Sequence, residues 1–217
     1  FLNTTTGVAV GTNGRILRST NAGASWGSVS SGTTRKIKGV SFASTTVGVA
    51  VGDQVILRTT NGGTSWALTS VPMYDLESVH FASATVGYAV GNVILKTIDG
   101  GINWTQISNL SGSDIYATNV DSAYISNSGV YKTSNTGVFW GTQPSIAPGT
   151  YNDIDFLNLN NGYVVGNGGK VYKTITGGEP LPQIDASVME IEAYSSTLCP
   201  GTLPVKKKKK NYGVQTL

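Results

Sequence analysis

The stretch Arg58–Trp66 reads Arg-Thr-Thr-Asn-Gly-Gly-Thr-Ser-Trp, and versions of it recur along most of the chain. Each good copy places an Arg or Lys eight residues before a Trp, with Asn or Asp and then Gly between them. A fifth copy, residues 173–181, has Thr176 at the Asn/Asp position and Leu181 at the Trp position. The four Trp residues are 40, 38 and 36 residues apart, and such a period predicts a repeat architecture. The turn and anchor positions are Asn21, Gly23, Trp26, Asn61, Gly63, Trp66, Asp99, Gly101, Trp104, Asn135, Gly137 and Trp140.

Each repeat contains four short segments that are typical of β-strands. In the second repeat, Ile37–Phe42 is apolar at alternate positions, and Gly48–Gly52 is a strand of small residues. A third strand is expected at Val55–Thr59. The Asn-Gly-Gly of residues 61–63 predicts a hairpin turn, because Asn and Gly tolerate positive φ. A fourth, outer strand is expected at Trp66–Thr69.

Four strands and one Trp per 40 residues predict an all-β fold, a β-propeller of four-stranded blades with five recognisable repeats over residues 1–181. Phe1 stands six residues before Gly7, as Phe42 stands before Gly48, so most of the first strand of blade one is expected to be missing. Residues 182–217 are expected to be a linker plus either a closing strand or the truncated start of a second β-domain. If residues 183–194 complete blade one, the ring has five blades. If they pack elsewhere, more blades precede residue 1.

Composition restricts the chemistry. Charged residues make up 12% of the chain, and the apolar runs are far shorter than the roughly 18 residues of a membrane span. The single Cys199 excludes an internal disulfide, and with one His in the sequence neither a metal site nor a cofactor is expected. Five of the fifteen cationic residues form the run Lys206–Lys210. The remaining ten are outnumbered by the twelve acidic residues. This balance does not indicate nucleic-acid binding.

The recurring Ser/Thr-x-Asn/Asp-x-Gly-x-x-Trp unit resembles the Asp-box (BNR) repeat. Together with the preceding Gly-x-Ala-Val-Gly strand and the Arg/Lys-Thr pair, it is most similar to the repeats of the photosystem II assembly factor family, the Ycf48-like propellers. The tail, from Ile184 through Cys199 to Leu217, resembles the opening of Ig-like modules in secreted proteins of Bacteroidota, although the five lysines depart from that pattern.

The resemblance implies a non-catalytic interaction or display module of a secreted or cell-surface bacterial protein, with a protein or glycan partner. One alternative is a periplasmic assembly factor of the Ycf48 type in a Gram-negative bacterium. Another is a glycoside hydrolase or glycan-binding propeller, because sialidases and some glucanases also carry Asp boxes. The chain is expected to be part of a larger multidomain protein or surface complex, with no transmembrane segment.

Two sets of residues are candidates for binding. The first is the cation of each repeat, which would form a positive ring around the propeller. The alternative is a structural role, in which each cation covers the Trp or bonds a neighbouring carbonyl. These cations are Arg18, Arg58, Lys96, Lys132 and Lys173. The second set is Ser41, His80 and Asp155, which precede the first-strand Phe and are expected to face the central channel.

A catalytic site is not expected. The chain has four arginines, and two of them, Arg18 and Arg58, are repeat-equivalent, so a sialidase arginine triad cannot be assigned. Asp153 and Asp155 are neighbours on one strand, whereas glycosidases need two carboxylates that flank the bond. The Asn and Asp residues of the repeats are assigned to turns, where their side chains bond backbone N–H groups.

Overall fold

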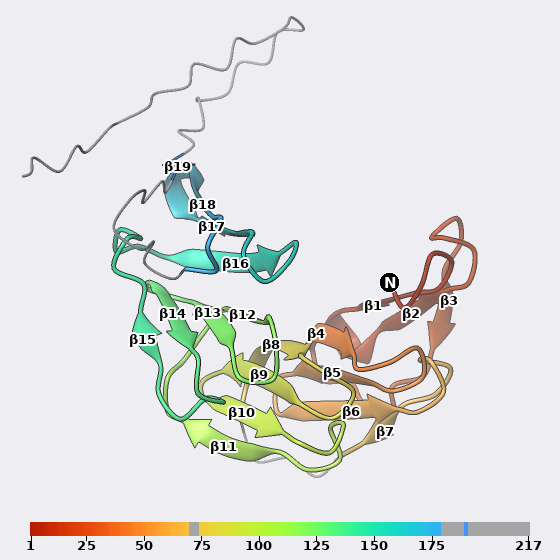
Figure 1. Ribbon diagram of the computed structural model, residues 1–217. Helices are drawn as coiled ribbons and strands as arrows, with labels where there is room; N and C mark the ends of the chain where they lie inside the picture. Colours follow the sequence, from red (N-terminus) through yellow and green to blue (C-terminus); the bar gives the residue numbers. More distant parts are fainter. Residues whose placement is uncertain (70–73, 179–188, 191–217) are drawn as a thin grey trace, which may run out of the picture.

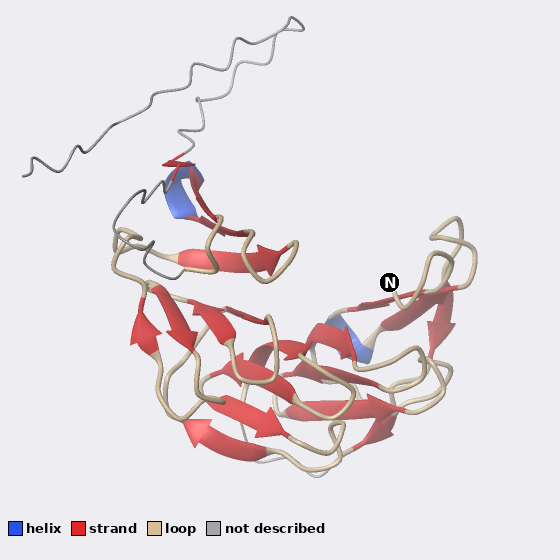
Figure 2. Ribbon diagram, viewed as in Figure 1, coloured by secondary structure: helices blue, strands red, loops and turns tan. Residues whose placement is uncertain are grey.

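The computed structural model describes residues 1–69, 74–178 and 189–190, and these form an open arc of five antiparallel sheets (Figure 1). Within every sheet the strands follow one another in sequence order, so each blade is a meander. Short 3-10 turns, η1 (Thr12–Gly14) and η2 (Asn167–Gly169), are the only helical elements in the described part of the chain (Figure 2). No helix in that part is long and apolar enough to cross a membrane.

The strand bounds follow the repeats. The first sheet has β1 (Gly7–Val10), β2 (Ile16–Ser19) and β3 (Gly27–Val29). The second has β4 (Ile37–Phe42), β5 (Gly48–Gly52), β6 (Val55–Thr59) and β7 (Ala67–Leu68). The third has β8 (Leu76–Phe81), β9 (Gly87–Gly91), β10 (Ile94–Thr97) and β11 (Thr105–Ser108). The fourth has β12 (Asp114–Ala117), β13 (Ala123–Ser126), β14 (Val130–Thr133) and β15 (Gly141–Thr142). The fifth has β16 (Tyr151–Phe156), β17 (Gly162–Gly166), β18 (Lys170–Thr174) and β19 (Met189–Glu190).

The predicted all-β fold and the predicted four-stranded blades are confirmed. The first sheet has three strands among the described residues. Met189 and Glu190 pair with β18 as the fourth strand of the fifth sheet, so the sheets continue past residue 181. This pairing places the described part of residues 183–194 on the fifth sheet and not on the first. The rest of the tail, including the Ig-like resemblance and the lysine run, lies outside the described residues.

The hydrophobic core lies between neighbouring sheets, in four clusters. The cluster between the second and third sheets contains Val49 and Ile56 from one side and Leu76, Ala89 and Leu95 from the other. Equivalent clusters join the first sheet to the second, the third to the fourth and the fourth to the fifth. A single sheet of this size cannot bury both faces, so each blade is stabilised by its neighbours, as in other repeat proteins.

The inner strands approach one another closely. A Cβ built on Gly39 of β4 would lie 3.0 Å from the Cα of Ser78 on β8, so a side chain at this position would force the two strands apart. The register of β4 against β5 shifts between Ile37 and Gly39, and β8 shifts in the same place relative to β9. Such bulges increase the local twist of the strand that carries them.

Candidate functional site

The outer turns repeat one hydrogen-bonded arrangement. In the second blade, Asn61 Oδ1 accepts the N–H of Ser65 at 3.0 Å and the hydroxyl of Thr59 at 2.9 Å. The Thr59 hydroxyl in turn accepts the N–H of Gly63 at 3.0 Å. Asn21, Asp99 and Asn135 accept equivalent bonds. The Asx side chain therefore replaces backbone partners inside the turn and is not available as a ligand.

Asp99 is the one carboxylate among these turn residues. Slight burial raises its pKa, but the hydrogen bonds from Asn103, Thr97 and the N–H of Ile102 outweigh this effect and leave the pKa below its usual range. The Asp99 carboxylate therefore stabilises its turn, as the Asn side chains do in the other blades.

The repeat cations connect neighbouring blades. Arg18 Nε donates to the carbonyl of Gly62 at 2.7 Å, and Arg58 Nε donates to that of Gly100 at 2.8 Å. Lys96 Nζ donates to the carbonyl of Thr136 at 2.8 Å, and Lys132 Nζ to that of Gly177 at 2.9 Å. Each acceptor is the residue after the Asx position in the next blade. This geometry favours the structural role of the cations over a positive ring that is free to bind a partner.

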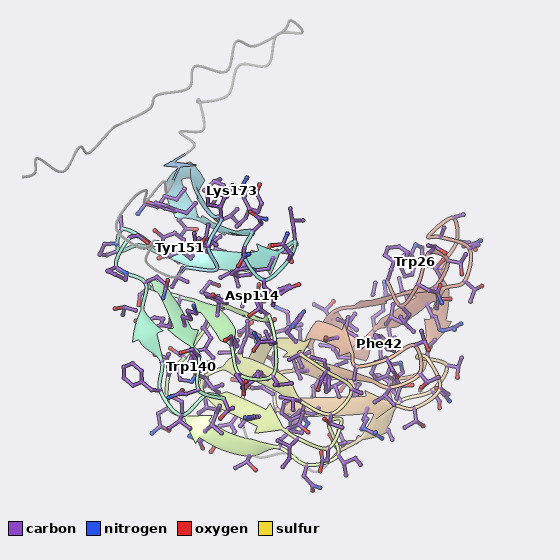
Figure 3. The ribbon with its side chains drawn as sticks, in the orientation of Figure 1. Trp26, Phe42, Asp114, Trp140, Tyr151 and Lys173 are labelled. Atoms are coloured by element: carbon purple, nitrogen blue, oxygen red, sulfur yellow. The ribbon has the colours of Figure 1, made fainter. Side chains whose placement is uncertain are left out.

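The Trp residues are packed between sheets. Trp66 contacts Phe42 edge-to-face at 6.0 Å between ring centroids, and Trp104 contacts Phe81 at 6.3 Å. Trp140 packs instead on Tyr88 of the preceding blade, at 6.5 Å. Trp26 belongs to the end blade and is 39% exposed. Figure 3 shows Trp26 at one end of the arc and Trp140 on its outer side.

The inner strands carry a different side chain in each blade, and these side chains also bond across blades. Ser41 Oγ accepts the N–H of Phe81 at 3.2 Å, and His80 Nδ1 accepts the N–H of Ala117 at 3.1 Å. Tyr116 Oη donates to the carbonyl of Phe156 at 2.9 Å. Asp155 has the equivalent position in the fifth blade, and its Oδ1 accepts the N–H of Phe156 in its own strand.

His80 is held as a neutral imidazole. Its ring stacks on that of Tyr116, with centroids 4.1 Å apart. Burial lowers the pKa of His80, and the attraction of the Asp155 carboxylate opposes this shift only in part. Because Nδ1 accepts a backbone N–H, the proton of the neutral ring is on Nε2.

Two carboxyl groups meet on the inner strands of the fourth and fifth sheets, two residues before Tyr116 and Asp155 respectively. Asp114 of β12 lies on the inner edge of the arc (Figure 3), where its Oδ2 accepts the N–H of Ile154 at 2.9 Å. Burial, together with a hydrogen bond to the Asp153 side chain, raises the pKa of Asp114 to about 6, although Ser78 and the Ile154 N–H act in the opposite direction. Two carboxylates this close share a proton more readily than they carry two charges.

Among the described residues, the side chains of Asp114, Asp153 and Asp155 form no salt bridge. Lys38 on β4 pairs with Asp53 at 2.5 Å and with Glu77 at 2.6 Å. Burial lowers the pKa of Lys38, but the bonds to these two carboxylates outweigh it and the pKa is raised. Asp153 and Asp155 are exposed on β16. The inner edge of the fourth and fifth blades is therefore an acidic wall, made of Asp114, Asp153 and Asp155.

The described ranges contain no candidate metal-binding cluster. No three His, Cys, Asp or Glu side chains gather there to bind a metal ion. A shallow depression beside the first sheet is lined by residues 13–14 and 29–34, none of which is titratable. The candidate site residues that sequence reasoning missed are Tyr116 and Asp114. Their spacing from the neighbouring repeats would have placed them beside His80 and Ser78, but the fourth repeat lacks the Phe that marks the register.

The family model described as photosynthesis system II assembly factor YCF48 matches residues 18–152, which is more than half of the chain. No curated protein matches the sequence.

Among solved structures, YCF48 bound to a D1 peptide is 15% identical and covers 82% of this chain and 77% of its own, with a TM-score of 0.50. The GH74 xyloglucanase from Xanthomonas campestris is 14% identical, and the match covers 86% of this chain and 37% of the xyloglucanase, with a TM-score of 0.66. U3-55K is 9% identical, and the match covers 78% of this chain and 58% of U3-55K, with a TM-score of 0.63. The present chain thus spans little more than a third of the xyloglucanase. At these identities the structures show a shared propeller fold, and the family match decides the assignment: the chain belongs to the YCF48 family.

Proposed function

We propose that this chain is a non-catalytic binding module, and that the acidic wall takes a basic segment of a protein partner. The observation that carries the proposal is the exposure of Asp153 and Asp155 beside Asp114 on the inner edge of the arc. Lys38, a cation of the neighbouring inner strands, is already paired with Asp53 and Glu77. Carboxylates that have no cationic partner attract Lys and Arg side chains.

The family supports a protein partner. One YCF48 structure holds a D1 peptide, and the present chain shares its family and fold. The proposal places this module in a secreted or surface protein, or in the periplasm, as part of a larger assembly. An assembly factor would bind a segment of one client protein, whereas a display module would hold a permanent partner.

The same carboxylates weigh against glycoside hydrolysis. Retaining and inverting glycosidases keep their two carboxyl groups about 5–5.5 Å or about 6.5–9.5 Å apart, which leaves room for the sugar or for a water molecule. Asp114 and Asp153 are within hydrogen-bonding distance of each other, and Asp114 also accepts a backbone N–H. Asp155 accepts the N–H of the next residue in its own strand.

The test is the binding of fluorescently labelled peptides, measured by anisotropy at low and high salt. A peptide of alternating Lys and Gly is the probe, and a peptide of alternating Glu and Gly is its control. The double variant Asp153→Asn/Asp155→Asn should weaken binding of the basic peptide by about tenfold or more at low salt. Asp121→Asn, at an exposed turn, removes a carboxylate elsewhere and should leave binding unchanged. Equal binding of both peptides, or an equal effect of Asp121→Asn, would contradict the proposal.

A further inference from the structure

Large hydrophobic side chains are exposed at one end of the third and fourth sheets. In each sheet, the turn after the first strand and the turn after the third strand lie at this end, and a backbone bond joins them. The N–H of Gly100 donates to the carbonyl of Thr85, and the N–H of Thr136 to that of Asp121, both at 2.9 Å. These turns carry side chains that are 41–82% exposed, and together they are named the apolar rim: Ile98, Ile102, Val120, Val138 and Phe139.

The apolar rim is continuous across the boundary between the two blades. Tyr88 Oη of the third blade donates to the carbonyl of Val120 at 3.0 Å, and Lys96 Nζ donates to that of Thr136 at 2.8 Å. The third and fourth sheets each have a neighbouring sheet on both sides, so the exposure of the rim does not result from an uncovered end of the arc. At the opposite end of the same two sheets, no large hydrophobic side chain of a described residue is exposed.

The hydrophobic residues of the rim are not needed to form the turns. In the second blade, Thr60 stands at the position of Ile98 and Ser65 at that of Phe139. The turn of the second blade nevertheless makes the same bonds to its Asx side chain and to its hydroxyl. The apolar residues of the third and fourth blades therefore add a property that the turn itself does not require, and exposed apolar patches of this kind mark interaction sites.

The backbone of the rim turns is satisfied within the protein. In residues 99–103, all five N–H groups donate to acceptors of the protein, and the same is true of residues 135–139. The carbonyls of Gly100 and Thr136 each accept a repeat cation. In hydrocarbon, backbone groups without a partner are costly, because no water is present to replace it. Turns with this bonding can therefore enter a lipid layer at low cost.

The chemistry of the rim fits lipid better than a protein partner. Four of its five side chains are aliphatic and stand on separate turns, whereas protein hot spots are rich in Trp, Tyr and Arg. Binding to a lipid surface scales with buried apolar area and needs no complementary shape. The rim turns, residues 98–103, 118–122 and 134–139, contain two acids, Asp99 and Asp121, and no Lys or Arg. They therefore offer no attraction for anionic headgroups.

We propose that the apolar rim inserts into the interfacial layer of a lipid bilayer with zwitterionic headgroups. This end of the third and fourth sheets would then rest on the membrane, with the aliphatic side chains among the upper parts of the acyl chains. The inference does not depend on the proposed function, because the acidic wall lies on the inner strands and the rim lies in the turns.

The test is cosedimentation of the full chain with phosphatidylcholine vesicles. The rim variant Ile98→Thr/Ile102→Thr/Val138→Thr/Phe139→Ser gives both outer turns the residues that the second blade has at the same positions. It should lower the partition coefficient by about tenfold or more, because it removes most of the apolar area. Binding of the original chain should be unchanged in about 0.5 M NaCl, since burial of apolar groups is not screened by salt. These vesicles carry no net charge, and both proteins keep the run Lys206–Lys210.

Leu68→Ser is the matched control. Leu68 of β7 is 68% exposed, as Phe139 is, but it lies on the outer strand of the second blade, outside the rim. This variant should partition as the original chain does. Circular dichroism and the thermal midpoint establish that each variant is folded.

The proposal is overturned if the original chain does not sediment with phosphatidylcholine vesicles at any lipid concentration, a result that requires no variant. It is also overturned if the rim variant binds as well as the original chain, or if Leu68→Ser loses as much binding as the rim variant. A dimer in sedimentation velocity that the rim variant abolishes would equally overturn it, since the occupant of the rim would then be a second copy of this chain.

Discussion

The outer turns repeat the same hydrogen-bonding pattern from blade to blade, whereas the inner strands carry a different side chain in each blade. Around the outside, the first four blades repeat one arrangement of Asx side chain, hydroxyl and glycine, and the cation of each bonds the turn of the next blade. Along the inner edge, the equivalent position is Ser41, His80, Tyr116 and Asp155 in successive blades. Both sets of side chains bond across blades, but only the inner set differs from blade to blade, so the inner set supplies the candidates for recognition of a protein partner.

The largest expected effect concerns the outer anchors. Trp104→Ala should destabilise the fold by about 3 kcal/mol or more, because it leaves a cavity between the second and third sheets. Trp26→Ala is the matched control at the same repeat position. Trp26 is 39% exposed at the end of the arc, so its loss should cost about 1 kcal/mol. Urea denaturation followed by circular dichroism measures both, and equal losses would show that the repeat anchors do not depend on neighbouring blades.

The inner edge should respond to pH. The folded-state pKa of Asp114 is raised to about 6, so its protonated carboxyl stabilises the fold at acidic pH, and this contribution is lost as the pH rises through 6. Asp114→Asn keeps an oxygen acceptor for the Ile154 N–H and removes the charge beside Asp153. The variant should therefore gain about 1–3 kcal/mol at pH 7.5 and show a flatter stability profile between pH 4 and 7.

Denaturation midpoints at pH 4.5 and 7.5 measure this effect. Asp121→Asn, in an exposed turn, should leave the pH profile unchanged. An Asp114→Asn variant that is destabilised equally at both pH values would mean that the carboxylate is needed in its ionised form.

A smaller effect is expected from the bonds between blades. Lys96→Met keeps the apolar stem but loses the bond from Nζ to the Thr136 carbonyl, which should cost about 1 kcal/mol. Lys36→Met changes an exposed lysine and should be neutral. Thermal denaturation compares the two variants. If both are neutral, the repeat cation is not needed for stability, and the hypothesis of a positive binding ring regains its support.

Repetition is also what made the fold predictable. The strands Ile37–Phe42, Gly48–Gly52 and Val55–Thr59 were predicted with their observed bounds, because small residues, apolar alternation and the Asn-Gly turn all agree within one repeat. The structural alternative for the cations was also stated from sequence. The carbonyl that each cation bonds could not be predicted, because the acceptor lies about 40 residues away in the next blade.

The inner edge was only partly predictable. His80 and Asp155 were identified because each precedes a Phe that marks the register of the first strand. The Asp114–Asp153 pair was missed, because the hydrogen bond between them depends on the distance between two inner strands, which no local pattern encodes. The placement of Met189 and Glu190 on the fifth sheet likewise depends on which edge strand is free to pair.

The smallest expected effect is a gain in stability at an outer turn that departs from its own repeat. Thr136 has φ = 62°, a left-handed conformation that a β-branched residue adopts at a cost, whereas Gly62, Gly100 and Gly177 occupy the same position in other blades. Thr136→Gly keeps the carbonyl that accepts Lys96 and relieves this strain, so it should stabilise the fold by about 0.5–1 kcal/mol. Thr142→Gly, in an exposed strand residue, is the control and should destabilise by a similar amount. A loss of stability in Thr136→Gly would mean that the threonine side chain itself supports the turn, and the outer ring would then be less uniform than its sequence pattern indicates.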